Sequence, residues 1–175
     1  MRFATQTAAK ARRARRSEPV ILFTVSNETF AIAADAVQEI RSTDSLAGAA
    51  LEFEQSEVPK VRHAFERAHR TYYVVNAGMH FGLDVTRPTL VLMLRQLRTA
   101  VLVDRIERMA EISALHPLPR AFTGDERNWY RGLAYLDDLV IPVIRPAGFL
   151  TAEEFERLDQ AWKTAEEQRE GAFSA

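Results

Sequence analysis

The chain has 175 residues, of which 47% are hydrophobic, and a formal net charge of −1 at pH 7. This length is enough for one domain or two small ones with a packed core, and the balanced charge excludes a global attraction to nucleic acid or anionic membranes. The absence of cysteine excludes disulfides, thiol catalysis and thiolate metal sites. No apolar run reaches the ~18 residues that a membrane helix needs.

The first 19 residues are rich in alanine, arginine and threonine and contain few large apolar side chains. Residues 1–18 carry six bases and one acid, a local charge of +5. Because such a composition cannot build a core, we expect a basic flexible tail over residues 1–19. Its charge leaves open a second use, the binding of nucleic acid or of an anionic lipid surface.

An internal repeat organises the rest of the chain. Alternating apolar residues predict one β-hairpin over residues 20–32 and another over residues 90–103, each around a polar turn. The two hairpins and the segments after them match at a constant offset of 69 residues, without a gap. The matched positions are Ile21 with Leu90, Phe23 with Leu92, Val25 with Leu94, Ile32 with Val101, Asp35 with Asp104, Val37 with Ile106, Ile40 with Met109, Val74-Val75 with Val143-Ile144, and Phe81 with Leu150.

The repeat predicts two similar β units in tandem, each starting with a hairpin and ending with an apolar strand. Asp35 and Asp104 stand at the same place after the second hairpin strand of each unit. A short acid after a strand can accept backbone N–H bonds and set a bend. We therefore favour a structural role for these two carboxylates over a catalytic one.

The segments between the hairpins are less regular. Residues 42–57 and 113–131 are polar or small or rich in proline and charge, and indicate loops. Residues 57–69 have apolar side chains at helical spacing and predict a short helix, with a strand over 61–67 as the alternative. The β-branched and aromatic run at residues 71–75 predicts a strand.

A last hairpin is predicted over residues 131–144, with Asp137-Asp138 in its turn. Its second strand contains Pro142. Because proline has no N–H to donate, we expect this strand at a sheet edge or at a bulge.

Residues 151–175 predict a C-terminal helix and tail. Thr151 and Glu154 are spaced as a capping box at the helix start. An apolar stripe should pack on the β body, although a free amphipathic helix that receives a partner is an alternative. The stripe consists of Phe155, Leu158, Trp162 and Ala165.

Motifs for catalysis are missing from the sequence. The four histidines form no HxxH or HExxH pair, and there is no glycine-rich phosphate loop and no GxSxG motif. Scattered aspartates could pair as acid and base only through the fold. We therefore expect no enzymatic activity, no cofactor and no metal site.

Three stretches resemble the family of CheW-like domains. Residues 23–41, FTVSNETFAIAADAVQEIR, resemble the family's first hairpin and its V-x-E-I segment. Residues 101–112, VLVDRIERMAEI, resemble its second-half signature, and residues 129–144, WYRGLAYLDDLVIPVI, resemble its closing pattern. The resemblance covers about residues 20–150.

This resemblance implies a mainly β fold with two tandem SH3-like five-stranded β-barrels in residues 20–150, followed by the helix of residues 151–175. It implies a cytoplasmic, non-catalytic coupling or scaffold protein of chemotaxis signal transduction, at membrane-associated receptor arrays and without membrane insertion. The implied partners are the regulatory domain of a CheA-like histidine kinase and the cytoplasmic tip of a chemoreceptor. The alternative function is a nucleic-acid-binding β-barrel protein that uses the basic N-terminal arm.

The resemblance also implies where partners bind. Val37, Glu39 and Ile40 match the V-x-E-I segment near the receptor groove, and Asp104 matches the second-half aspartate. The full set of expected partner-binding residues is Val37, Glu39, Ile40, Arg41, Val101, Val103, Asp104 and Ile106.

The sequence departs from the family pattern in one connection. The family's G-V-I-N-L-R-G segment falls on residues 63–69, HAFERAH, which lack both glycines and the arginine of the pattern, with Arg67 and Arg70 nearby. Asn76 and Arg145 stand where the family has aspartate. Because glycine permits backbone conformations closed to other residues, we expect a changed chain path at residues 63–69.

Overall fold

A computed structural model of the chain describes residues 17–47, 50–53, 56–84 and 86–174. The basic tail predicted over residues 1–19 therefore lies outside the described residues as far as residue 16. The first strand begins at Glu18, so the last two residues of that predicted tail belong to the β body.

The elements follow the repeat. The first repeat contributes β1 (Glu18–Val25), β2 (Glu28–Ala33), η1 (Ala34–Ala36), β3 (Val37–Ser42), η2 (Thr43–Leu46), β4 (Leu51–Glu52), β5 (Val61–Arg67), β6 (Arg70–Asn76) and α1 (Ala77–Phe81). The second contributes β7 (Leu90–Leu94), β8 (Thr99–Val103), β9 (Arg105–Ile112), α2 (Glu126–Trp129), β10 (Tyr130–Leu136), β11 (Leu139–Ile144) and η3 (Pro146–Gly148). The long helix α3 (Ala152–Phe173) follows.

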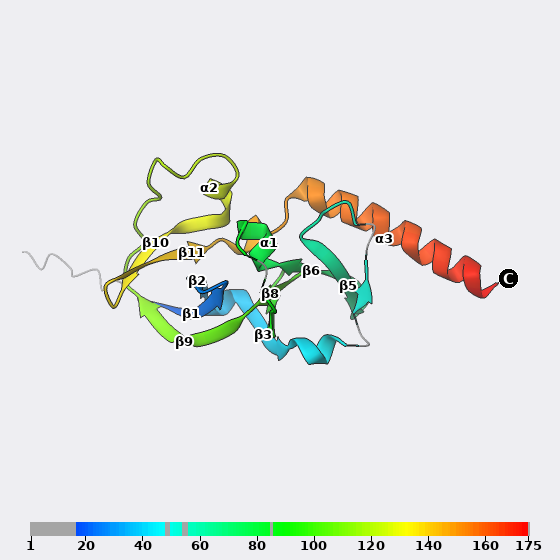
Figure 1. The fold of residues 1–175 in the computed structure, drawn as a ribbon, viewed down its shortest axis with the longest axis horizontal. Helices are drawn as coiled ribbons and strands as arrows, with labels where there is room; N and C mark the ends of the chain where they lie inside the picture. Colours follow the sequence, from blue (N-terminus) through cyan, green and yellow to red (C-terminus); the bar gives the residue numbers. More distant parts are fainter. Residues whose placement is uncertain (1–16, 48–49, 54–55, 85, 175) are drawn as a thin grey trace, which may run out of the picture.

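The strands form two sheets in which the repeats exchange their hairpins (Figure 1). The first sheet has the order β10-β11-β2-β1-β9, and the second has the order β3-β7-β8-β6-β5-β4. Equivalent strands take equivalent places, since β2 lies parallel to β11 just as β8 lies parallel to β6. The repeat is therefore confirmed, but its two copies are not separate tandem bodies. Each sheet joins the hairpin of one copy to the remaining strands of the other.

The expected SH3-like five-stranded barrels are not confirmed, because the described sheets are open and have five and six strands. Both sheets nevertheless curl. In the first sheet, paired backbone hydrogen bonds join His116, just beyond β9, to Leu133 of β10. In the second, Glu39 of β3 contacts Arg67 of β5 at 2.7 Å. In a flat sheet these two strands would lie roughly 19 Å apart, since three others separate them.

The sheets divide the core into three clusters. The largest lies between the two sheets and includes Phe23, Tyr73 and Val101. A second, smaller cluster lies on the opposite face of the first sheet and includes Leu22. A third lies on the opposite face of the second sheet and includes Val74. Since successive residues of a strand point to opposite faces, central strands are buried on both sides. This arrangement explains the continuous apolar runs in the sequence.

The helix predicted over residues 57–69 is wrong, because β5 occupies residues 61–67 as the alternative proposed. A register shift between Val61 and His63 marks a bulge in β5. A bulge moves the side-chain alternation by one residue, so the buried Val61 and Ala64 stand three residues apart and imitate helical spacing. The loops predicted at 42–57 and 113–131 contain short elements, β4 and α2 among them.

Pro142 lies in β11, which is an interior strand, so the predicted edge position is wrong. The strand pair β10–β11 does contain a bulge, between Tyr130 and Gly132. Leu133, which faces Pro142 in register, directs its own N–H and C=O to His116. The β10 side therefore requires no N–H from residue 142. On the other side, the pairing of β11 with β2 is confined to Val143 and Ala31.

Helix α3 is capped and packed as the sequence predicts. The capping box of Thr151 and Glu154 is complete, with both reciprocal hydrogen bonds present. Leu158 and Trp162 are buried in the main core, and Phe155 and Ala165 pack against it. The C-terminal end of the helix extends away from the sheets (Figure 1). None of the described helices is long and apolar enough to span a membrane.

A polar anchor fixes α3 to the second sheet. The Asp159 carboxylate accepts two hydrogen bonds from the Arg98 guanidinium, both at 2.9 Å, and one from the hydroxyl of Tyr73 at 2.6 Å. The Arg98 hydrogen bonds hold the pKa of Asp159 below its ordinary value. Tyr73 is fully buried, so its hydroxyl depends on this carboxylate as an acceptor.

We expect Asp159→Ala to lower the free energy of unfolding by roughly 2–3 kcal/mol, since it leaves a buried phenol and a half-buried guanidinium without their acceptor. Urea denaturation measures the change. Glu153→Ala is the matched control on the same helix, because Glu153 makes only an exposed pair with Arg157. That pair should contribute about 0.5 kcal/mol or less. Equal losses in the two variants would contradict the anchoring role of Asp159.

Candidate partner-binding surfaces

A charged cluster lies on β3, at the edge of the second sheet. The carboxylate of Glu39 accepts hydrogen bonds from Arg41 and from Arg67, each at 2.7 Å. The hydrogen bond from Arg67, followed by that from Arg41, lowers the pKa of Glu39 below its ordinary value. Two guanidinium groups around one carboxylate leave this charged cluster with a net charge of +1.

The local structure of β3 presents this cluster to solvent. A register shift between Val37 and Glu39 bulges the strand at Gln38. Val37 is buried in the main core before the bulge, whereas Ile40 is 42% exposed beyond it. Glu39 and Arg41 alternate with Ile40, so the charged pair and the exposed apolar side chain lie on opposite faces of one edge strand.

Arg67 was missing from the residues expected at the site. It stands at the end of β5, directly before a two-residue turn in which Ala68 and His69 both have positive φ, 52° and 59°. Two-residue hairpins of this kind usually carry glycine or asparagine. The hairpin therefore closes without either family glycine, and the change of chain path expected at residues 63–69 amounts to a strained turn.

Other expected residues lie in the core. Val101 and Val103 are fully buried in β8, an interior strand, and Ile106 is partly buried against the same cluster. No partner can touch Val101 or Val103 while the sheet is folded. The partner-binding role of Glu39, Ile40 and Arg41 stays a prediction.

Asp104 fastens the crossing of β8 into β9, which lie in different sheets. Its carboxylate accepts the N–H of Ser26 at 2.7 Å and the hydroxyl of Thr86 at 2.6 Å. Its own N–H donates to the carbonyl of Thr24. The bend-setting role expected for Asp104 is confirmed. At Asp35 the contact is of another kind, because the side-chain Nε of Arg95 donates to the backbone carbonyl of Asp35, so the bend-setting role of the Asp35 carboxylate stays a prediction.

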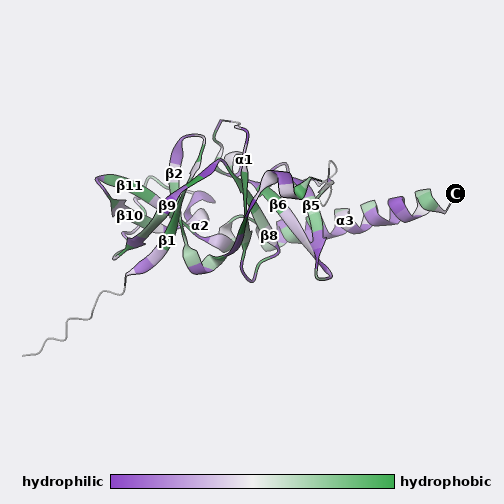
Figure 2. Ribbon diagram, turned by 90° about the horizontal axis from the view of Figure 1, so that it is seen from below, coloured by the Kyte–Doolittle hydropathy of each residue, from purple (hydrophilic) through white to green (hydrophobic). Residues whose placement is uncertain are grey.

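A second exposed surface lies on the hairpin of β10 and β11. Tyr135 and Val140 face each other across the two strands and are 58% and 54% exposed, and Leu139 is 58% exposed. The ring of His116 stands edge-on to Tyr135, with centroids 4.5 Å apart. This apolar hairpin lies at the end of the molecule opposite α3 (Figure 2). From the sequence we predicted only an ordinary hairpin here. The signal that could have identified this surface is the presence of three large apolar residues, Tyr135, Leu139 and Val140, beside the turn.

Metal ligands do not gather on the described part of the chain, where no three His, Asp or Glu side chains are placed to hold an ion. The candidate sites are therefore the charged cluster and the apolar hairpin, which belong to different sheets.

The comparisons with known proteins agree with this architecture. The family described as "CheW-like domain" matches residues 19–154. Among solved structures, the scaffolding protein TtCheW from Thermoanaerobacter tengcongensis is similar, with a TM-score of 0.64 and 15% sequence identity. The match covers 78% of this chain and 90% of that one. No curated protein matches the sequence significantly.

Proposed function

Because this chain belongs to the family of CheW-like domains, we propose that it is a non-catalytic coupling protein of chemotaxis-type signalling, which links chemoreceptors to a histidine kinase in the cytoplasm. A coupling protein needs two separate surfaces, one for each partner. The observation that carries the proposal is the pair of exposed surfaces on the two sheets, the charged cluster on β3 and the apolar hairpin of β10 and β11.

The charged cluster is assigned to the receptor. Its net charge of +1 favours a partner segment that presents carboxylates. Val37 anchors β3 in the core, and the rigid edge strand then holds Glu39 and Arg41 in fixed positions. A fixed pair binds its partner more tightly than a mobile one does, because less side-chain freedom is lost on binding.

The apolar hairpin is assigned to the regulatory domain of the kinase. Exposed contiguous apolar surface on a folded domain marks an interaction site. Tyrosine is among the residue types that contribute most to binding energy at interfaces, and Tyr135 is 58% exposed on this hairpin. From Gly132 to Leu136 the strand β10 pairs with β11 without a register shift, so the surface at the tip of the hairpin is preformed.

The proposal is tested by co-sedimentation, in which membranes that contain a chemoreceptor are mixed with a CheA-like histidine kinase, with and without this chain. We expect the kinase to sediment with the receptor only when the chain is present. The double variant Tyr135→Ser, Val140→Ser should weaken kinase binding about 10-fold, the effect of removing two partly exposed apolar contacts, and should leave receptor binding intact.

Phe173→Ser is the matched control, since Phe173 is 92% exposed but lies at the far end of α3. It should bind the kinase as the unaltered chain does. Kinase sedimentation that is independent of the chain would refute the coupling function. Equal effects of the hairpin and Phe173 variants would refute only the assignment of the kinase surface.

A further inference from the structure

The turn at the tip of the hairpin β5–β6 has an unfavourable backbone conformation. Ala68 and His69 form this turn, and both have positive φ. An alanine with positive φ brings its Cβ atom too close to the following carbonyl oxygen. The two other two-residue hairpin turns in the described part of the chain contain residues that tolerate this conformation better, Asn27 in one and Asp137-Asp138 in the other. The tip at residues 68–69 is therefore less stable than another sequence would make it.

The residues on either side of this turn add a second unfavourable feature. Arg67 and Arg70 stand directly opposite each other, and like charges in that arrangement destabilise a strand pair. Arg67 is compensated, because it donates to Glu39 at 2.7 Å. Arg70 is exposed, and no carboxylate of the described residues forms an ion pair with it. Glu66 alternates with Arg67 along β5 and therefore lies on the opposite face of the strand.

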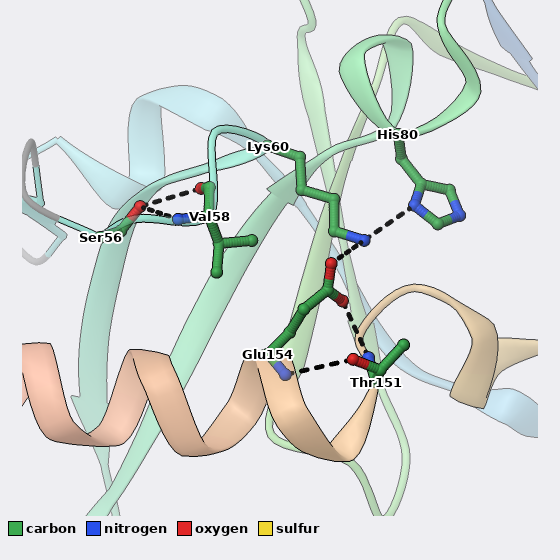
Figure 3. Close-up of polar contacts among 6 residues, drawn as sticks. All are labelled: Ser56, Val58, Lys60, His80, Thr151 and Glu154. Carbon is green, nitrogen blue, oxygen red and sulfur yellow. Dashed lines mark hydrogen bonds and ion pairs between the residues drawn. The ribbon is translucent and has the colours of Figure 1, made fainter. Parts of the chain in front are cut away.

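Helix α3 supports the tip from one side. His69 and Arg70 border a recess of about 340 Å³ whose opposite wall is α3, with Lys163 among the lining residues. The helix is fixed at its start, where Glu154 pairs with Lys60 at 3.1 Å (Figure 3). Further along, the polar anchor to the second sheet fixes it again. Because β3 holds the other side of the tip through the charged cluster, the surrounding structure keeps the turn in its strained conformation.

Arg70 gives the recess its excess positive charge. Apart from Arg70, two cations and two carboxylates line the recess and balance each other, namely Arg98, Lys163, Asp159 and Glu166. With histidine neutral, the three cations against two carboxylates leave a net charge of +1. The adjoining charged cluster on β3 also has a net charge of +1. Both surfaces therefore favour a partner that presents carboxylates.

The spacing of the two arginines suits an α-helix. Residues that stand directly opposite each other on two strands have Cβ atoms roughly 5 Å apart. Residues three or four positions apart on a helix have Cβ atoms about 5–6 Å apart. Arg67 uses one of its N–H donors on Glu39, so the guanidinium groups of Arg67 and Arg70 can both donate to further carboxylates.

We propose that the tip of β5–β6 binds an acidic α-helix of the partner, in which two carboxylates three or four positions apart pair with Arg70 and Arg67. A sequence keeps two unfavourable features at one turn where binding requires them. The inference rests on the proposed function, because the tip adjoins the charged cluster that is assigned to the receptor, and the helix is therefore a helix of the receptor. Arg70 makes the tip specific for an acidic segment.

The test measures receptor affinity and thermal stability in the same variants of the full chain. Arg70→Thr should weaken the binding of a soluble chemoreceptor fragment about 5- to 10-fold, because one charge-assisted hydrogen bond is lost. The same variant should raise the melting temperature by about 1–2 °C, because the like-charge pair at the turn is removed. A residue with only a structural role would lower both. Arg70→Lys keeps the charge and should bind within about threefold of the unaltered chain.

Two control variants separate the charge of Arg70 from its surroundings. Ala68→Asn relieves the same turn without a change of charge, so it should raise the melting temperature and bind the receptor as the unaltered chain does. Arg120→Thr removes an exposed arginine from the loop between β9 and α2 and should also leave receptor binding unchanged. Unchanged affinity in Arg70→Thr, an equal loss in either control, or a lower melting temperature in Arg70→Thr would overturn the inference and leave the coupling function standing. A receptor that does not bind the unaltered chain at all would refute the coupling function, and the inference with it.

Discussion

Replacing Glu39 with lysine should weaken binding of this protein to a chemoreceptor tip by roughly 30-fold or more. The change removes the carboxylate that Arg41 and Arg67 share and brings three cations together where β3 meets β5. Breaking a hydrogen-bonded charge pair that a partner covers costs about 2–5 kcal/mol of binding energy, and the lower figure corresponds to roughly 30-fold. Titration of the chain against a soluble receptor fragment measures the affinity.

Glu111→Lys is the control for the receptor measurement, since it makes the same change of net charge at an exposed position of β9. The swapped variant Glu39→Arg, Arg67→Glu separates two roles of the pair. If the swapped variant binds as the unaltered chain does, the ion pair acts by ordering the surface; if its affinity is lost, the receptor contacts each charge directly. An unchanged affinity in Glu39→Lys would show that the charged cluster is not part of the surface that binds the receptor.

His80 should make the fold sensitive to mild acid. Its burial, and then the neighbouring Lys60 ammonium, lower the pKa of this imidazole to about 3 from the ordinary 6.5. Between these values the unfolded chain binds a proton that the folded chain excludes, so stability is complete above about pH 6.5 and falls as the pH drops towards 3. The loss at pH 5 is about 2 kcal/mol relative to pH 7.5, at ~1.4 kcal/mol per pH unit.

Urea denaturation at pH 7.5 and pH 5.0 measures this loss. His80→Phe keeps the aromatic packing with Trp129 and Phe149 and removes the titrating group, so its stability should change by about 2 kcal/mol less between the two pH values. His69→Asn removes an imidazole from an exposed turn and should keep the full pH dependence. Identical pH dependence in His80→Phe and the unaltered chain would contradict the assignment to His80. Carboxylates such as Asp159, whose pKa is lowered, lose their contribution only at more acidic pH.

The repeat could be predicted from the sequence because each strand has its own alternation of apolar and polar residues. Ile21 and Leu90, or Phe23 and Leu92, occupy equivalent places in the two sheets, as the offset predicts. The exchange of hairpins could not be predicted, since both copies contain the same kinds of strand. The sequence pattern would be the same whether a hairpin paired with strands of its own copy or of the other copy. Which strand meets which depends on packing between residues far apart in the chain.

The candidate sites were predicted unevenly for a similar reason. Glu39, Ile40 and Arg41 lie at the surface of an edge strand, but an apolar run such as Val101 to Val103 does not reveal whether it faces a partner or the core. Arg67 was missed because the bulge in β5 imitates a helix and because only the curl of the sheet brings β5 to β3. Asn76 replaces an aspartate without loss, since its side chain caps α1 by accepting the N–H of Met79.

The exchange of hairpins between the sheets bears on how such a chain can arise. A polypeptide with one copy of the repeat would have a hairpin and three further strands, but these do not pair with each other in the order that either sheet uses. Two such molecules that exchanged their hairpins would form a symmetric dimer of interlocked subunits with this strand order. The present chain has the topology of such a dimer fused end to end. Cutting it between the copies should therefore yield two halves that fold only when mixed.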